Sequence, residues 1–346
     1  MRLILKTATC VMLISVTQLF GQGITVVGSG YSLPQLLVAP GQITRLFASG
    51  LKTVLSGQQR ATGLPLPSSL AGISVTITQS SGSGPQSYAV PLLAVDQVDV
   101  CNNGLRSGAC LITTITVQIP YELPILSGFA SAPPNATRMV IAESGSTSAG
   151  FPITVVRDNV HILTNCDSLI GSFLQGAVCK PVVTHVDGTL VTAFSPGRPG
   201  EEIVVYALGL GGTAPPVSTG QVTPVPPPLF LEGNLYIQFD FRPNAAPSLP
   251  YYPAPTAASA IPVADFVGLT PGQVGLYQIN IRLPDTFPTI PSCTLPTISF
   301  PEPAIFSVDS NLTIDVSTGV TAQPPGTPGY VPLRFDGAAI CVVPSN

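Results

Sequence analysis

His161 and His185 are the only histidines in this chain, so a histidine general base would have to be one of them. A serine hydrolase would need that histidine beside a serine and a carboxylate. No G-x-S-x-G turn occurs in the sequence, and neither histidine lies in a strand–turn–helix context. His185 stands close to Asp187 and Gly188, which predicts a polar turn, and His161 is expected at a strand end near a domain boundary. The sequence therefore predicts no catalytic residue.

Paired carboxylates could instead cleave a glycosidic bond or bind a cation. Glu201 and Glu202 are adjacent at the start of an expected strand, where neighbouring side chains point to opposite faces, so they cannot flank one bond. Asp96 and Asp99 bracket an expected loop and, with the amides at 102–103, could offer oxygen ligands to calcium. Solvated loop carboxylates are far commoner, and no EF-hand spacing is present. We expect no metal and no cofactor.

Three further patterns are typical of binding or modification sites. The glycine run Gly209–Gly212 is expected to be a turn and not a phosphate loop, because no lysine follows it and no helix begins after it. Tyr251 and Tyr252, flanked by prolines, could form an exposed platform on which sugars or proline-rich peptides stack, or could cover the core. Asn135 and Asn311 begin glycosylation sequons.

Residues 1–23 read as a secretory signal peptide, with two early positive charges, an apolar centre and small residues at the end. The apolar run is too short for a retained membrane anchor, and no second apolar span follows. Without Arg2 and Lys6 the formal net charge of −4 becomes about −6. No basic patch is present, so nucleic-acid binding is not expected. We expect a protein secreted or held at the cell surface, with the periplasm as the alternative.

Six cysteines remain beyond this leader, after Cys10 within it. An even number of cysteines after an export signal is typical of disulfides. A zinc site is not expected, because no Cys-x-x-Cys pair is present and neither histidine is close to a cysteine pair in the required spacing. The nearest neighbours in sequence suggest three local disulfides, Cys101–Cys110, Cys166–Cys179 and Cys293–Cys341.

The elements that would position these residues are short strands. Charged residues make up only 9% of the chain, whereas 38 prolines and 33 glycines interrupt a sequence that is 45% hydrophobic. This composition excludes disorder and long amphipathic helices and favours an all-β fold with many turns. Alternating runs such as Ile73–Thr78 and Leu111–Ile119 predict half-buried strands, and Tyr88–Val95 predicts an edge or bulged strand because Pro91 interrupts it.

Two stretches share one plan and predict an internal repeat. Pro40 and Pro199 each open a Pro-Gly turn followed by an alternating strand. Pro120 and Pro284 each end a strong strand, and they are separated by nearly the same length of chain as Pro40 and Pro199. We therefore predict two tandem β-sandwich domains after the signal peptide. The expected boundaries are 24–157 for the first domain, 158–195 for linking strands and 196–346 for the second domain.

Several stretches resemble a secreted family that is abundant in acidobacteria (the Solibacter type) and often forms the C-terminal part of larger proteins. They include TITVQIPYEL, VVTHVDGTLVTAFSPGRPGEEIVVYALGLGG and FVGLTPGQVGLYQINIRLPD, and the resemblance covers about 38–283. It implies paired immunoglobulin-like (IPT/TIG-type) sandwiches exported from the cell. The family has no established activity, so it implies no catalytic residues. This chain departs from the pattern in its cysteine-bounded loops, its proline-rich insert around Tyr251 and its longer tail after Pro284.

The leading hypothesis is a secreted, non-enzymatic interaction or structural module, with a polysaccharide or a cell-surface protein as partner. Loops at the ends of the sandwiches would make the contacts. The alternative is a carbohydrate-binding or adhesion module that uses Tyr251 and Tyr252. A secreted hydrolase is the third hypothesis, and pairing with another chain by strand addition is the fourth.

Overall fold

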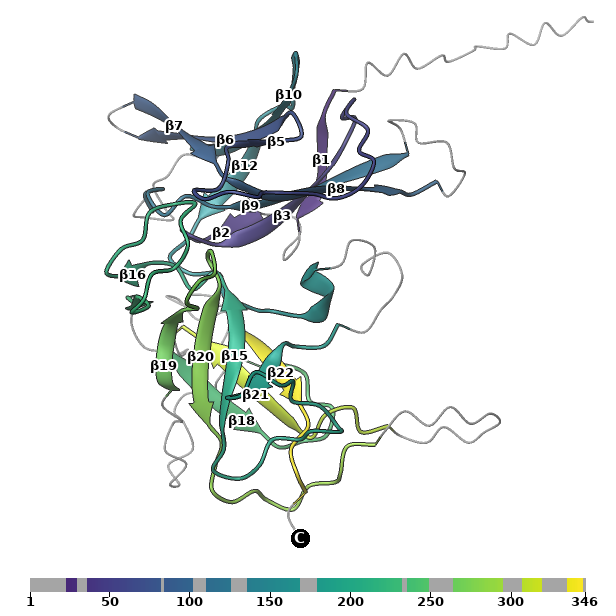
Figure 1. Ribbon diagram of the computed structural model, residues 1–346, viewed down its shortest axis with the longest axis vertical. Coiled ribbons are helices and arrows are strands. Elements are labelled where there is room, and N and C mark those ends of the chain that lie inside the picture. Colours follow the sequence, from purple (N-terminus) through teal and green to yellow (C-terminus); the bar gives the residue numbers. More distant parts are fainter. Residues whose placement is uncertain are drawn as a thin grey trace, which may run out of the picture.

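The computed structural model describes residues 23–29, 36–81, 84–101, 110–125, 136–168, 179–231, 235–248, 264–294, 307–318 and 335–344. The signal peptide expected at 1–23 therefore lies almost wholly outside the described residues. The chain is all-β, and the one helical segment among the described residues is the 3-10 turn η1 (Asn165–Ser168). No helix within these ranges is long and apolar enough to cross a membrane. Figure 1 shows two bodies of strands, one from each half of the sequence.

The first body contains two sheets around one hydrophobic core. One sheet has the order β1-β3-β9-β8-β4, and the other has the order β2-β12-β10-β6-β5, with β7 on β6 and β11 on β10. Their strands are β1 (Thr25–Ser29), β2 (Leu36–Val38), β3 (Ile43–Ser49), β4 (Gln59–Arg60), β5 (Ser69–Leu70), β6 (Ile73–Ser81), β7 (Gly84–Val90), β8 (Leu92–Asp99), β9 (Leu111–Gln118), β10 (Thr137–Glu143), β11 (Ser146–Thr147) and β12 (Phe151–Val155). The core residues, including Leu46, Ile77 and Ile115, all fall between 24 and 155.

The second body repeats this arrangement with fewer strands. One sheet has the order β13-β15-β20-β19-β17-β16, with β14 on β15, and the other is β18-β21-β22. Their strands are β13 (His161–Ile162), β14 (Val183–His185), β15 (Glu202–Leu208), β16 (Thr213–Ala214), β17 (Leu229–Phe230), β18 (Tyr236–Asp240), β19 (Ala264–Leu269), β20 (Tyr277–Arg282), β21 (Leu312–Ser317) and β22 (Phe335–Ile340). Its core residues fall between 160 and 342, so each body encloses its own core, as expected of paired sandwiches.

Alternation of side chains explains why these segments form strands. In β6, Ile73, Val75 and Ile77 are buried, whereas Thr76 and Thr78 on the opposite face are partly exposed. β-branched residues suit both positions because they favour an extended backbone. One face of β6 can therefore enter the core while the other remains in contact with water.

The two bodies share the same strand register, which indicates an internal duplication. Ile43 on β3 pairs with Gln118 on β9, and Glu202 on β15 pairs with Arg282 on β20. Ile43 and Glu202 each lie three residues after the proline of their Pro-Gly turn. Gln118 and Arg282 each lie two residues before the proline that ends their strand. A β-bulge also recurs at equivalent positions. It lies in β8 opposite residues 116–117 of β9, and in β19 opposite residues 280–281 of β20. Bulges are specific local features, so a shared one is strong evidence of common descent.

The same Pro-Gly turn begins both repeats, with the same hydrogen bonds. Gln42 accepts a hydrogen bond from the backbone N–H of Ala39 through its side-chain oxygen, at 2.8 Å. Glu201 accepts one from the backbone N–H of Arg198 in the same way, at 2.8 Å. A parallel pairing recurs as well, between β2 and β12 in the first body and between Gly197 and Val342 in the second. Glu201 is therefore the structural counterpart of Gln42.

Gly209 and Gly211 allow the second body to pack closely on the connection between β12 and β13. Both have positive φ, at 75° and 96°. A Cβ on Gly209 would lie 2.3 Å from the carbonyl oxygen of Asn159, and one on Gly211 would lie 2.2 Å from that of Arg157. Only glycine permits this approach. The run Gly209–Gly212, expected to be a turn, is thus part of the contact between the two bodies.

Direct hydrogen bonds also join the two bodies. The backbone N–H of Gly220 donates to the side-chain oxygen of Gln118 at 2.7 Å, and Gln118 is fully buried. The backbone N–H of Tyr121 donates to the hydroxyl of Thr219 at 2.8 Å. The amide of Asn159 donates to the carbonyl of Leu37 at 3.0 Å. These bonds involve backbone groups that are buried or partly buried at the junction, so each body satisfies polar groups of the other.

The structure refines two expectations about elements. The stretch Tyr88–Val95 has both expected features: among the described residues β7 pairs only with β6, at the edge of its sheet, and β8 has a bulge between Leu92 and Ala94. Pro91 separates these two strands, which belong to different sheets. Proline has no backbone N–H for a ladder, so it fits the point at which the chain passes from one sheet to the other. The range 158–195, expected to hold linking strands, contributes β13 and β14 to the second body and four of its core residues, Val160, Ile162, Val183 and Val191.

Candidate functional site

The segment 183–195, called here the 183–195 hairpin, lies at the edge of the second body. β14 turns at 186–188, and the chain returns so that Thr184 bridges Leu190. The N–H of Gly188 donates to the carbonyl of His185 at 3.0 Å, and Asp187 accepts from the N–H of Thr189 at 2.9 Å. The polar turn expected from His185, Asp187 and Gly188 is therefore present, with the Asp-Gly pair at its tip.

The hairpin brings together three side chains that are separate in sequence. The Nε2 atom of His185 lies 3.1 Å from the hydroxyl oxygen of Ser195, and its Nδ1 atom lies 2.5 Å from a carboxylate oxygen of Glu201. This serine–histidine–carboxylate order is the one found in nucleophilic hydrolases. The side chains of His185 and Glu201 are 13% and 24% exposed, whereas Ser195 is exposed to solvent. Ser195 is thus accessible, while the histidine and the carboxylate beside it are largely covered.

Other contacts of these residues hold the backbone. His185 Nε2 also lies 3.1 Å from the carbonyl oxygen of Ser195, so the ring contacts two oxygens of one residue. The second carboxylate oxygen of Glu201 accepts the N–H of Arg198. The N–H of Ser195 donates to the carbonyl and hydroxyl of Thr192 at 3.2 Å. The arrangement therefore fixes the end of the hairpin against the start of β15, whatever chemistry it supports.

The sequence pattern does not predict this set, although His185 and Glu201 are both candidates in it. As expected, Glu201 and Glu202 do not act together: Glu202 accepts a hydrogen bond from the amide of Asn280 at 2.8 Å, whereas Glu201 binds His185. Ser195 belongs to no motif, and its hydroxyl reaches the histidine only because the hairpin closes. The internal repeat is the one sequence feature that singles out Glu201, because a carboxylate stands there where the first repeat has Gln42.

Apolar side chains project from the same hairpin into solvent. Val186 is 67% exposed, Leu190 is 53% exposed and Phe194 is 83% exposed. Leu190 also lines a cavity of about 230 Å³, together with Val191, Cys341, Lys180 and Asp309. These three exposed apolar side chains all belong to the 183–195 hairpin.

His161, expected at a strand end near the domain boundary, lies on β13 and bridges two carboxylates. Its Nε2 is 3.0 Å from Asp167, and its Nδ1 is 3.1 Å from Asp336 on β22. Burial lowers the pKa of the imidazole, but the two carboxylates outweigh it and raise that pKa to about 9. His161 therefore carries a positive charge at neutral pH and serves as a structural ion pair that joins β13 to β22.

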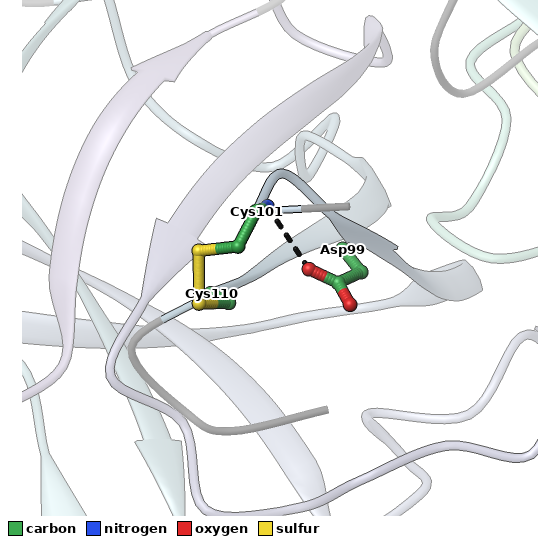
Figure 2. A group of neighbouring side chains, drawn as sticks. All are labelled: Asp99, Cys101 and Cys110. Carbon is green, nitrogen blue, oxygen red and sulfur yellow. Dashed lines mark hydrogen bonds between the residues drawn. A yellow bond between two sulfur atoms is a disulfide. The ribbon is translucent and has the colours of Figure 1, made fainter. Parts of the chain in front are cut away.

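The two carboxylates considered as calcium ligands do not share a face. Asp96 and Asp99 both lie on β8, three positions apart, so they point to opposite faces of the sheet. Asp99 accepts the N–H of Cys101 at 3.0 Å, and Figure 2 shows its carboxylate turned toward that backbone nitrogen, beside the disulfide to Cys110. Disulfide sulfurs are not metal ligands in the way that thiolates are. Within this group Asp99 is therefore the one carboxylate that could bind a hard cation. Residues 102–103 lie outside the described residues.

The six cysteines form three disulfides in the pairing that sequence neighbours suggested. The S–S distances are 2.06 Å for Cys101–Cys110, 2.01 Å for Cys166–Cys179 and 2.04 Å for Cys293–Cys341. Three disulfides fit an oxidising compartment outside the cytosol.

The remaining predicted sites give no surface feature among the described residues. Tyr251 and Tyr252 lie outside those residues, as does Asn135. Asn311 is fully buried and its amide donates to the carbonyls of Pro291 and Val342, both at 2.9 Å, so it is inaccessible to a glycosyl donor in the folded protein. Asp315 on β21 is also buried, and this burial raises the pKa of its carboxyl to about 6.

No family model matches the chain, and no curated protein is similar to it in sequence. The function has to be inferred from the residues themselves.

Proposed function

We propose that this chain is a secreted, non-enzymatic interaction module that binds a cell-surface protein or a polysaccharide through the 183–195 hairpin. In this proposal the two bodies are tandem immunoglobulin-like sandwiches of the IPT/TIG type, as the resemblance to the acidobacterial family implies. The three disulfides support an extracytoplasmic site of action. Secretion and surface attachment both agree with them.

The observation that carries the proposal is Phe194, which is 83% exposed at the end of a hairpin fixed by His185 and Glu201. Aromatic side chains that insert into a partner supply much of the binding free energy at interfaces. A contact held in place before binding loses little conformational entropy on binding. Phe194, Val186 and Leu190 together therefore form a preorganised apolar contact surface.

The test compares Phe194→Ser with Val225→Ser, whose wild-type side chain is 82% exposed in another segment. Purified wild-type and variant proteins would be incubated with isolated cell envelopes and with a panel of insoluble polysaccharides, and the retained fraction measured. We expect Phe194→Ser to weaken retention by roughly 10-fold or more, the loss typical of an interface hot spot. Val225→Ser should behave as the wild type.

Equal retention of wild type and Phe194→Ser would contradict the assignment of the hairpin. Polysaccharide retention that survives in Phe194→Ser but is lost in the double variant Tyr251→Ala/Tyr252→Ala would instead support carbohydrate recognition by those tyrosines. Catalytic turnover of any polysaccharide or ester, lost when one polar residue is changed, would refute a non-enzymatic function.

A further inference from the structure

We propose that Ser195 is a nucleophile, activated by His185 and positioned through Glu201, that accepts an acyl group from activated carboxylic esters. This goes beyond the proposed binding function, because it adds a covalent step. The distances of 3.1 Å from Ser195 Oγ to His185 Nε2 and 2.5 Å from His185 Nδ1 to Glu201 are those of a nucleophile, its base and an orienting carboxylate.

The three groups are held by separate backbone contacts. The N–H of Ser195 donates to Thr192, which fixes the serine in its turn. Glu201 is fixed by the N–H of Arg198, in the turn that both repeats share. His185 is the last residue of β14 and pairs with Ile203 on β15. The serine, the base and the carboxylate therefore keep their relative positions without a bound substrate, which general-base activation requires.

The chemical step is an acyl transfer. The reactive state is the neutral ring with its proton on Nδ1, in which Nε2 no longer donates to the carbonyl oxygen of Ser195, 3.1 Å away. The hydroxyl oxygen of Ser195 attacks the carbonyl carbon of the ester, and its proton passes to Nε2 of His185. A new bond forms between that oxygen and the acyl carbon as the bond from this carbon to the leaving group breaks. The proton then passes from Nε2 to the departing phenolate or thiolate. Glu201 stays ionised throughout and stabilises the imidazolium through its contact with Nδ1.

The hydrogen bonds of the surrounding backbone lead us to expect that the acyl group stays on the serine. The N–H groups of Phe194 and Ser195 both donate to Thr192. The N–H of Gly197 donates to Cys341 and that of Arg198 donates to Glu201. Residue 196 is a proline and has no N–H. These four N–H groups are therefore not available to a developing oxyanion. Loss of such donors slows acyl transfer by roughly 100-fold or more. An ester with a good leaving group can still react, whereas hydrolysis of the resulting alkyl ester by water is slow.

The substrate class follows from the same surface. The nucleophile needs an activated acyl donor, that is, an aryl ester or a thioester. Phe194 directly precedes Ser195 and is exposed, so a short apolar acyl chain can cover it. The hairpin would thus become covalently acylated once per molecule, which is compatible with a binding protein that is not a turnover enzyme.

The experiment uses p-nitrophenyl butyrate with the full-length protein. We expect a burst of about one equivalent of nitrophenolate without sustained turnover, the pattern of an acyl-enzyme that accumulates. Intact mass should show one butyryl group, and peptide mapping should place it on Ser195. Ser195→Ala should abolish the burst. The matched control, Ser87→Ala, removes an exposed serine that lies on β7 far from either histidine in sequence, and should leave the burst unchanged.

Glu201→Gln separates activation from folding, because glutamine can still accept the N–H of Arg198. We expect it to lower the burst rate by roughly 10-fold or more. We also expect His185→Gln to lower the burst rate at least as strongly, because it removes the base. A burst of equal size in Ser195→Ala, or acyl groups spread over many serines of the wild type, would overturn the proposal. Sustained turnover by the wild type that is lost in Ser195→Ala would overturn both the single acylation and the non-enzymatic function. Absence of any burst in the wild type would overturn the acylation proposal but not the proposed binding function.

Discussion

At the scale of single residues, His161 illustrates how two carboxylates decide the charge of a histidine. Burial alone would favour the neutral ring, but Asp167 and Asp336 each contact one ring nitrogen. Asp167 is itself fixed by the N–H of Thr164 at 2.6 Å, so it cannot turn away from the ring without losing that bond. The charged form is therefore favoured by a geometry that the backbone maintains.

This geometry predicts a pH-dependent stability. The pKa of His161 is raised from 6.5 to about 9 in the folded protein, so its contribution is fully present below about pH 6.5 and is lost as pH rises through 9. We expect the free energy of unfolding to fall by on the order of 2 kcal/mol between pH 7 and pH 9.5, allowing for partial exposure of the ring. Urea unfolding at several pH values would measure it.

The control for this prediction is His161→Gln, which cannot carry the charge and should show a much flatter dependence above pH 7. Asp315 does not interfere, because its pKa of about 6 places its contribution below this window: it is present at acid pH and lost as pH rises through 6. A His161→Gln variant with the same slope as the wild type would show that other groups cause the change.

At the scale of elements, the glycines after β15 show how backbone approach constrains sequence. Gly209 and Gly72 have similar positive φ values, 75° and 77°. A Cβ on Gly72 would meet nothing within 4 Å, whereas one on Gly209 would lie 2.3 Å from the carbonyl oxygen of Asn159. The two positions therefore share the conformational requirement but differ in the steric one.

Alanine at these two positions should separate the two effects. Gly72→Ala should cost about 1–2 kcal/mol of stability, the penalty for a left-handed alanine. Gly209→Ala should cost clearly more, about 3 kcal/mol or above, because the connection between the bodies must also shift. Denaturant unfolding of both variants would measure the difference. Equal losses would mean that the contact at Asn159 relaxes freely.

At the scale of the whole molecule, two separate cores are linked by a hydrogen-bonded junction and stabilised by disulfides of different span. Cys293–Cys341 encloses a sequence separation of 48 residues, and Cys101–Cys110 encloses one of 9. A longer closed loop restricts the unfolded chain more strongly. The C-terminal disulfide therefore contributes more to stability than the one next to β8.

Replacing each pair by serines should reveal this order. The chain-entropy relation predicts a loss of about 4 kcal/mol for Cys293→Ser/Cys341→Ser and about 2.5 kcal/mol for Cys101→Ser/Cys110→Ser. The first variant should lower the unfolding transition of the second body, and the second should affect the first body. Calorimetry resolves the two if they unfold separately. A larger loss for the shorter loop would show that strain or residual structure outweighs chain entropy.

Local patterns in the sequence determined much of the fold. Alternation predicted β6 and β9, the Pro-Gly turns and their spacing predicted the repeat, and nearest-neighbour cysteines predicted the disulfides. These features depend on interactions between residues close in the chain, or on a periodicity of two that one strand already expresses. The passage of the chain between sheets at Pro91 did not follow from this pattern, because alternation does not reveal which partner a strand will find.

Only the tertiary structure decided which side chains meet. Ser195, His185 and Glu201 are brought together by the closure of the 183–195 hairpin against β15, and no motif of local spacing encodes that contact. His161 likewise meets Asp336, which lies near the end of the chain, only because β13 lies beside β22. Sequence periodicity records which face of a strand is buried, whereas the relative placement of distant strands results from packing of the whole core.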